Sequence, residues 1–218
     1  MIAIKMKHLG LLTAAAALLS TSAVALAQST PSFAGNFRLH STTFFNNGTL
    51  PVSTVLNNQV NGVNTCTATG VAGGDQSPEL TWTGAPEGTR SYVVVLYDVT
   101  AAFTHWGIYN ISGNATGLPA NAGVAGSTFG SQVGNDFGLG QEYDGPCPPA
   151  NVAPDAHQYV FTVYALSTRL ELPSSANFAP NGETLYHALI QAGQNGQILG
   201  TASLTGYFSS TPPATTAN

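Results

Sequence analysis

Apolar residues fall in short dense runs along this chain, separated by stretches rich in Gly, Asn, Thr and Pro. The runs 91–98, 105–111 and 157–166 are apolar on both faces of an extended chain, which is typical of central strands covered on both sides. Shorter or edge strands are predicted at 80–83 and 197–208, and a further pair of strands within 33–45. The pattern predicts a mainly β protein.

One helix is predicted near the C-terminal end of the chain. Asn181 is a capable N-cap, and Gly193 is a plausible residue to end the helix. Apolar residues between them recur at i, i+3, i+4 and i+7, which places them on one helical face. These residues are Leu185, Ala188, Leu189 and Ala192. The segment 112–156 has no strand pattern and is expected to form a long loop, which in a compact domain is usually functional or ordered by its own packing.

The first residues have the features of a secretory signal peptide. A basic start at Lys5 and Lys7 precedes an apolar run over 9–19 and the small-residue cleavage site Ala25-Leu26-Ala27. We therefore expect a signal peptide at 1–27, a single domain at 28–208 and a flexible tail at 209–218. The alternative of an anchoring helix is disfavoured because no long apolar run follows, so the expected location is periplasmic or extracellular, with no transmembrane anchor.

The net charge of the chain limits the kinds of partner that it can bind. Without the signal peptide the chain has three arginines, no lysine and ten acidic residues, a formal charge of −7. Phosphate backbones are bound by arrays of Lys and Arg, so nucleic acid is excluded as a partner, and docking on anionic membrane surfaces is disfavoured.

The two cysteines, Cys66 and Cys147, are far apart in an exported chain. An even pair in an oxidising compartment predicts one disulfide. Two buried thiols are the alternative, and a two-cysteine zinc site is less favoured because neither residue belongs to a Cys-x-x-Cys pair.

Titratable and aromatic residues gather where the strongest strands end. Asp98 closes one predicted strand, His105 begins the next, and His157 opens a third. If these strands are antiparallel neighbours, the three side chains share one edge of the sheet. Tyr159 lies on the same strand face as His157, and Gly145-Pro146 could form a rigid wall that a ligand approaches closely. We expect a small polar pocket for an anion such as a phosphate head group. The alternative is that Asp98 caps a turn and each histidine is a satisfied structural residue.

At these residues the chain resembles the phosphatidylethanolamine-binding protein (PEBP) family, and in particular its bacterial Raf-kinase-inhibitor-like branch. The resemblance runs from about 77 to 208. It is carried by Ser77-Pro78-Glu79-Leu80-Thr81-Trp82, Gly84-Ala85-Pro86-Glu87-Gly88-Thr89, Asp98, His105-Trp106, Gly145-Pro146-Cys147-Pro148-Pro149 and His157-x-Tyr159-x-Phe161.

The resemblance implies a PEBP-like antiparallel β-sandwich with a few short peripheral helices, no cofactor and no metal. It also implies a small anion pocket at one end of the sandwich. Secreted relatives place cysteines as Cys66 and Cys147 are placed. The pocket residues that it implies are Asp98, His105, Gly145, Pro146, His157 and Tyr159.

The chain departs from the family pattern near the pocket. The family usually has Asp-Pro-Asp-Ala-Pro where this chain has residues 98–102, Asp-Val-Thr-Ala-Ala. The segment 98–102 is therefore expected to be more flexible than in the family, and the edge of the pocket is expected to be less negative. The family often has a basic residue where this chain has Gln158, and residues 70–74 lengthen the loop after Cys66.

A non-catalytic binding protein for a small anionic ligand is the favoured function. A protease inhibitor or a protein-interaction module on the same scaffold, with a protein partner, is the alternative. An enzyme is less favoured. Asp98, His105 and His157 could be read as a two-histidine, one-carboxylate metal site, but the resembled family uses these positions for anions. A hydrolase with a Gly-x-Ser-x-Gly nucleophile turn is disfavoured because that motif is missing from the sequence.

Overall fold

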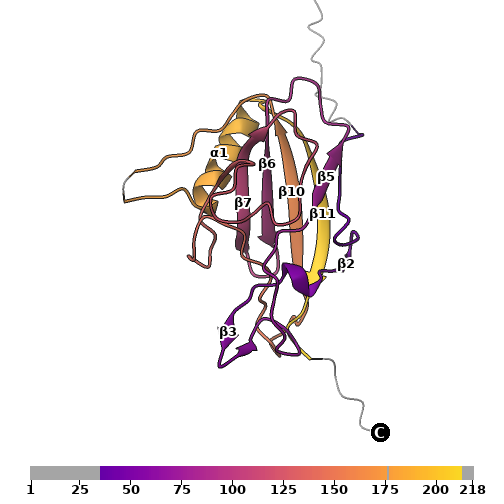
Figure 1. Cartoon of the computed structure of the whole chain (residues 1–218). Coiled ribbons are helices and arrows are strands. Elements are labelled where there is room, and N and C mark those ends of the chain that lie inside the picture. The colour runs from indigo at the N-terminus through magenta and orange to yellow at the C-terminus, as the bar shows by residue number, and fades with distance from the viewer. Residues whose placement is uncertain (1–34, 176, 213–218) are drawn as a thin grey trace, which may run out of the picture. The chain divides into compact units, whose positions relative to one another are not determined.

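The computed structural model describes residues 35–175 and 177–212, which belong to one compact unit (Figure 1). The predicted signal peptide and residues 213–218 of the predicted tail lie outside the described residues. The elements are β1 (Arg38–His40), β2 (Gly48–Thr49), η1 (Val52–Thr54), β3 (Gln59–Val60), β4 (Val63–Asn64), β5 (Leu80–Thr83), β6 (Ser91–Asp98), β7 (Phe103–Ser112), β8 (Gly117–Leu118), β9 (Ser131–Gln132), β10 (His157–Leu166), α1 (Gly182–Gln194) and β11 (Ile198–Phe208).

The larger sheet has six strands in the order β2-β11-β10-β6-β7-β9. Strand β6 lies between β10 and β7 and runs antiparallel to both, and β10 also pairs with β11 along its whole length. The runs predicted as central strands are therefore central. The run over 197–208 was predicted as a shorter or edge strand. Strand β11 has eleven residues, and on its outer side it pairs only with the two-residue β2.

The smaller sheet, in the order β1-β5-β8, packs across one face of the larger one. Leu80 and Trp82 of β5 belong to the same buried cluster as Leu96 of β6, Trp106 of β7 and Phe161 of β10. The predicted β-sandwich is thus confirmed, with one α-helix and one 3-10 turn among the described residues.

The pair of strands predicted within 33–45 is wrong. Of the described residues in that range only Arg38–His40 form a strand, which pairs with β5. The polar groups that follow it bond instead to Glu79: the Ser41 hydroxyl donates to its backbone oxygen at 2.6 Å, and the Thr42 amide donates to its carboxylate at 2.8 Å. These hydrogen bonds satisfy the polar groups of residues 41 and 42 without a second strand.

Helix α1 begins where the sequence predicts and ends later. The Asn181 side chain accepts a hydrogen bond from the Thr184 amide at 3.0 Å, and the Thr184 hydroxyl accepts one from the Asn181 amide at 2.9 Å. The predicted end at Gly193 is wrong, because that residue is helical. The left-handed residue beyond the helix is Gly196, with φ of 65°.

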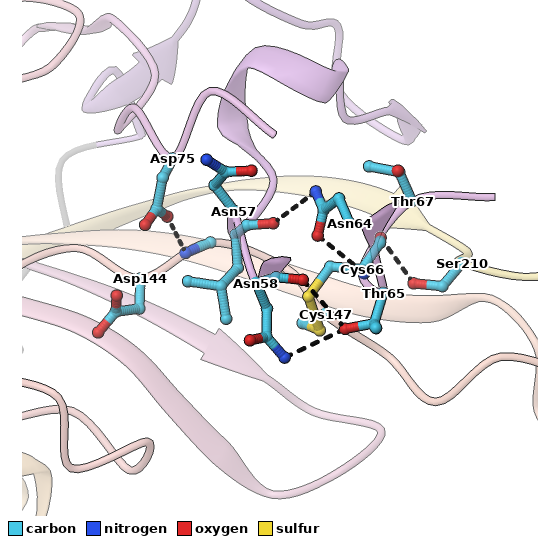
Figure 2. Close-up of a disulfide and its surroundings, with 12 residues drawn as sticks. Asn57, Asn58, Asn64, Thr65, Cys66, Thr67, Asp75, Asp144, Cys147 and Ser210 are labelled. Atoms are coloured by element: carbon cyan, nitrogen blue, oxygen red, sulfur yellow. Dashed lines mark hydrogen bonds between the residues drawn. A yellow bond between two sulfur atoms is a disulfide. The ribbon is translucent and has the colours of Figure 1, made fainter. Parts of the chain in front are cut away.

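A disulfide joins the predicted pair Cys66 and Cys147, whose Cα atoms are 4.5 Å apart. It ties the segment around the β3–β4 hairpin to the loop that precedes β10 (Figure 2). The Ser210 hydroxyl donates to the Cys66 carbonyl at 2.8 Å, and the Thr211 hydroxyl lies 3.3 Å from Asp155. The described part of the predicted tail is therefore held against the domain.

Candidate functional site

Three strand ends meet at one edge of the larger sheet, the lower end in Figure 1. In the strand register Asp98 of β6 lies opposite both Tyr159 of β10 and Phe103 of β7. His105 and His157 are therefore brought to the same edge as Asp98. All six predicted pocket residues are buried here.

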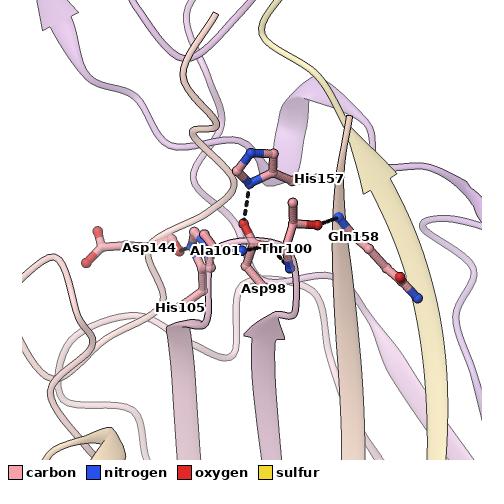
Figure 3. Close-up of polar contacts among 7 residues, drawn as sticks. All are labelled: Asp98, Thr100, Ala101, His105, Asp144, His157 and Gln158. Carbon is pink, nitrogen blue, oxygen red and sulfur yellow. Dashed lines mark hydrogen bonds and ion pairs between the residues drawn. The ribbon is translucent and has the colours of Figure 1, made fainter. Parts of the chain in front are cut away.

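Asp98 is hydrogen-bonded through both carboxylate oxygens (Figure 3). Oδ2 lies 2.7 Å from His157 Nδ1, and Oδ1 accepts from the amides of Thr100 and Ala101 at 2.8 and 3.1 Å. The Thr100 hydroxyl in turn accepts from the Gln158 amide at 2.9 Å. Asp98 thus caps a turn, as the structural alternative supposed, and also orients an imidazole. These hydrogen bonds join residues 98–101 to His157 and Gln158 of β10.

His105 is oriented by the backbone rather than by a carboxylate. Its Nδ1 lies 2.9 Å from the Asp144 carbonyl oxygen, which can only accept, so Nδ1 carries the proton. Burial lowers the pKa of His105, although the nearby Asp144 and Gly145 carbonyls and the Asp98 charge act in the opposite direction. At neutral pH the ring is therefore neutral, and its Nε2 is an acceptor.

The predicted wall residues Gly145 and Pro146 are held by groups distant in the sequence. The Gly145 amide donates to Asp75 Oδ1 at 2.8 Å, and the Pro146 carbonyl accepts from the Leu56 amide at 3.2 Å. Just before the wall, the Asp144 carboxylate accepts from the Asn135 side chain. The disulfide to Cys147 follows directly. The sequence reasoning missed these supports because each joins segments that its local patterns treat separately.

Tyr159 has the one orphaned polar atom among the buried side chains of the described residues. Its ring is completely buried. Its hydroxyl lies near the Asp98 carboxylate but has no partner in hydrogen-bond geometry. Burial, followed by the negative charge of Asp98, raises the pKa of the phenol, so it remains a proton donor. An unpaired buried hydroxyl costs about 1–3 kcal/mol, which is the kind of cost that functional sites retain.

The edge carries several acids and none of the described arginines. The Arg90 amide bonds to the Leu166 carbonyl at the opposite end of β10, and Arg169 follows that end. Arg38 follows Phe37, which lies against Gly200, far along β11 from the site. Any anion held here must therefore be held by hydrogen-bond donors.

Asp75 gives the site a testable pH dependence. Burial, and then the charges of Asp144 and Glu142, raise its pKa to about 6 against the lowering effect of the Gly145 amide. The folded state therefore holds the proton more tightly than the unfolded state, and the contribution of Asp75 to stability falls as the pH rises from 3.8 to about 6. We expect Asp75→Asn, which keeps the acceptor, to stabilise the protein more at pH above this range than below it. Urea unfolding at both ends of the range checks this. An equal effect at both would contradict the assigned shift.

The described residues thus form a β-sandwich that carries an Asp–His pair, a second histidine and a buried tyrosine at one end. Residues 40–209 match the model of the family described as phosphatidylethanolamine-binding protein, so the chain belongs to that family.

Known relatives support this assignment. The UPF0098 protein YbcL of Escherichia coli is 41% identical over 116 residues, which cover 50% of this chain and 61% of YbcL. The matched region thus spans less than two thirds of that relative. A UPF0098 protein of Methanothermobacter thermautotrophicus is 39% identical over 138 residues, 61% of this chain and 82% of the relative. The crystal structure of Escherichia coli YbcL, described as a new member of the mammalian PEBP family, matches with a TM-score of 0.63 and 31% identity, over 80% of this chain and 98% of that one.

Within residues 35–175 and 177–212, no group of three or more His, Cys, Asp or Glu side chains is arranged to hold a metal ion. In the same ranges no helix is long and apolar enough to cross a membrane.

Proposed function

We propose that this chain is an exported, non-catalytic binding protein whose buried cluster binds a small anion, such as phosphate or a phospholipid head group. The observation that carries the proposal is the Tyr159 hydroxyl, a buried donor with no partner in the protein. A ligand oxygen would satisfy it. Export is supported by the signal-like first 27 residues and by the Cys66–Cys147 disulfide.

The second polar group in the proposed site is His157. Its Nδ1 lies 2.7 Å from Asp98 Oδ2, so the ring nitrogen available to a ligand is Nε2. His105, which is neutral, would accept a hydrogen bond from a protonated oxygen or an amine of the ligand. Gly145 and Pro146 would form the wall, with their supports fixed before the ligand arrives.

The hydrogen bonding and the pKa of these side chains favour a binding function over a catalytic one. An Asp–His pair activates a hydroxyl in hydrolases. The hydroxyl-bearing ring beside His157 is Tyr159. Its ring centroid lies 6.4 Å from that of the imidazole, and its hydroxyl makes no hydrogen bond to the imidazole. The raised pKa of the phenol also opposes its use as a nucleophile.

Tyr159→Phe is expected to separate binding from folding. Removing the orphaned hydroxyl should raise the free energy of unfolding of the unliganded protein by about 1 kcal/mol, while weakening anion binding roughly tenfold. Calorimetric titration with phosphate and with phosphoethanolamine, together with urea unfolding, measures both effects. The two ligands distinguish a free phosphate site from a head-group site.

Tyr143→Phe is the matched control, because the Tyr143 hydroxyl is also buried but donates to the Thr54 carbonyl at 2.7 Å. That variant should lose about 1 kcal/mol of stability. If Tyr159→Phe behaves in the same way and leaves anion binding unchanged, the hydroxyl is structural and the proposal fails.

A further inference from the structure

A cavity lies on the outer face of the larger sheet, opposite the site. It is a groove of about 680 Å³, and none of the six proposed pocket residues lines it. Side chains alternate along a strand. Since Asp98 and Tyr159 lie on the inner face of β6 and β10, their neighbours Tyr97 and Val160 lie on the outer face, in the groove.

Helix α1 covers only part of this outer face. Leu185 and Leu189 of the helix pack with Val93 and Leu166, toward the end of the strands that is distant from the site. The nearer part of the face is left open beside the helix, so the floor of the groove is Val95, Tyr97, Val160, Thr162 and Tyr164. Tyr97 is 37% exposed, and Tyr186 of the helix, which forms the side wall, is 64% exposed.

The charged residues of the groove are all negative. The charged residues that line it are Asp136 and Glu183, and its described lining includes no Arg, Lys or His. Asp136 lies in the long loop, after β9, and its carboxylate accepts a hydrogen bond from the Thr104 amide at 2.7 Å. Glu183 lies in the first turn of α1, where it offsets the partial positive charge of the helix N-terminus.

We propose that this groove is a second binding site, which takes a small amphiphilic amine with its hydrocarbon part on the tyrosine and valine floor and its ammonium group beside Asp136 and Glu183. The volume is that of a small-molecule site. Two carboxylates at the polar margin favour a cation, and exposed tyrosine faces attract cations as well. The proposal is independent of the anion site.

The test compares three ligands with one hydrocarbon chain: octylammonium, octanol and octanoate. Backbone amide NMR spectra of the mature protein are recorded during each titration, at mildly alkaline pH. We expect saturable shifts at Tyr97, Val160 and Leu185 with octylammonium, roughly tenfold weaker binding of octanol and no binding of octanoate.

One double variant that removes both charges and one control sharpen the test. Asp136→Asn, which keeps an acceptor for Thr104, combined with Glu183→Gln should weaken octylammonium binding roughly tenfold. Glu171→Gln, an exposed acid outside the groove, should leave binding unchanged. The proposal is overturned if octylammonium shifts only residues around His105 and His157, if octanoate binds as well as the amine, or if the double variant binds with wild-type affinity.

Discussion

Gly145→Ala is expected to lower the free energy of unfolding by about 3 kcal/mol, a large effect for the addition of one methyl group. A Cβ atom on Gly145 would lie 1.9 Å from the Thr54 carbonyl oxygen and 2.9 Å from the Leu56 nitrogen. Both are backbone atoms, so no side chain can rotate away, and the wall of the proposed pocket must move. Urea unfolding measures the loss.

Substitution of a second glycine is the control, because its expected effect on the free energy of unfolding has the opposite sign. Gly193 is inside α1, and a Cβ there would make only an ordinary contact, 3.6 Å from Ile198. Gly193→Ala should therefore raise the free energy of unfolding by about 0.5–1 kcal/mol, because glycine loses more backbone entropy in a helix. Wild-type stability in Gly145→Ala would show that the wall is not held as described.

Removal of the disulfide is expected to cost about 4 kcal/mol of unfolding free energy in the loop-entropy model. The bridge joins residues 81 positions apart, so it removes much of the freedom of the unfolded chain. It also anchors the wall through Cys147, which directly follows Pro146. Replacing Cys66 and Cys147 together by serine should therefore both destabilise the protein and weaken anion binding.

The reduced wild-type protein is the natural comparison for that variant. Its urea midpoint in the presence of a dithiol should match the midpoint of the double serine variant, and the variant itself should not respond to the dithiol. If thiol titration shows complete reduction and the wild-type midpoint does not move, the bridge does not contribute as expected.

The strongest elements could be predicted because their signals are local. Strands 91–98 and 157–166 are apolar on both faces, and their bounds in the structure match the prediction. Asn181 caps α1 through a bond to the third residue beyond it, so a short window of sequence contains the whole signal. The shared edge followed from the antiparallel pairing of these strands.

The remaining features depend on contacts between distant segments. Asp75 and Gly145 are 70 residues apart, and no pattern in either segment indicates that they bond. The second strand of the pair expected within 33–45 is replaced by bonds to Glu79, which lies more than thirty residues away. The groove depends on how far α1 extends over the sheet, and a helical pattern does not specify this.

The most direct test of the proposed function follows the imidazole signals of the mature, oxidised protein by NMR during titration with phosphate and phosphoethanolamine. We predict saturable shifts of His157 and His105 that are lost in His157→Gln, while His40 and His187, which lie outside the site, stay unchanged. No shift of either site histidine at millimolar ligand, or equal shifts of all four, would contradict the assignment of an anion pocket.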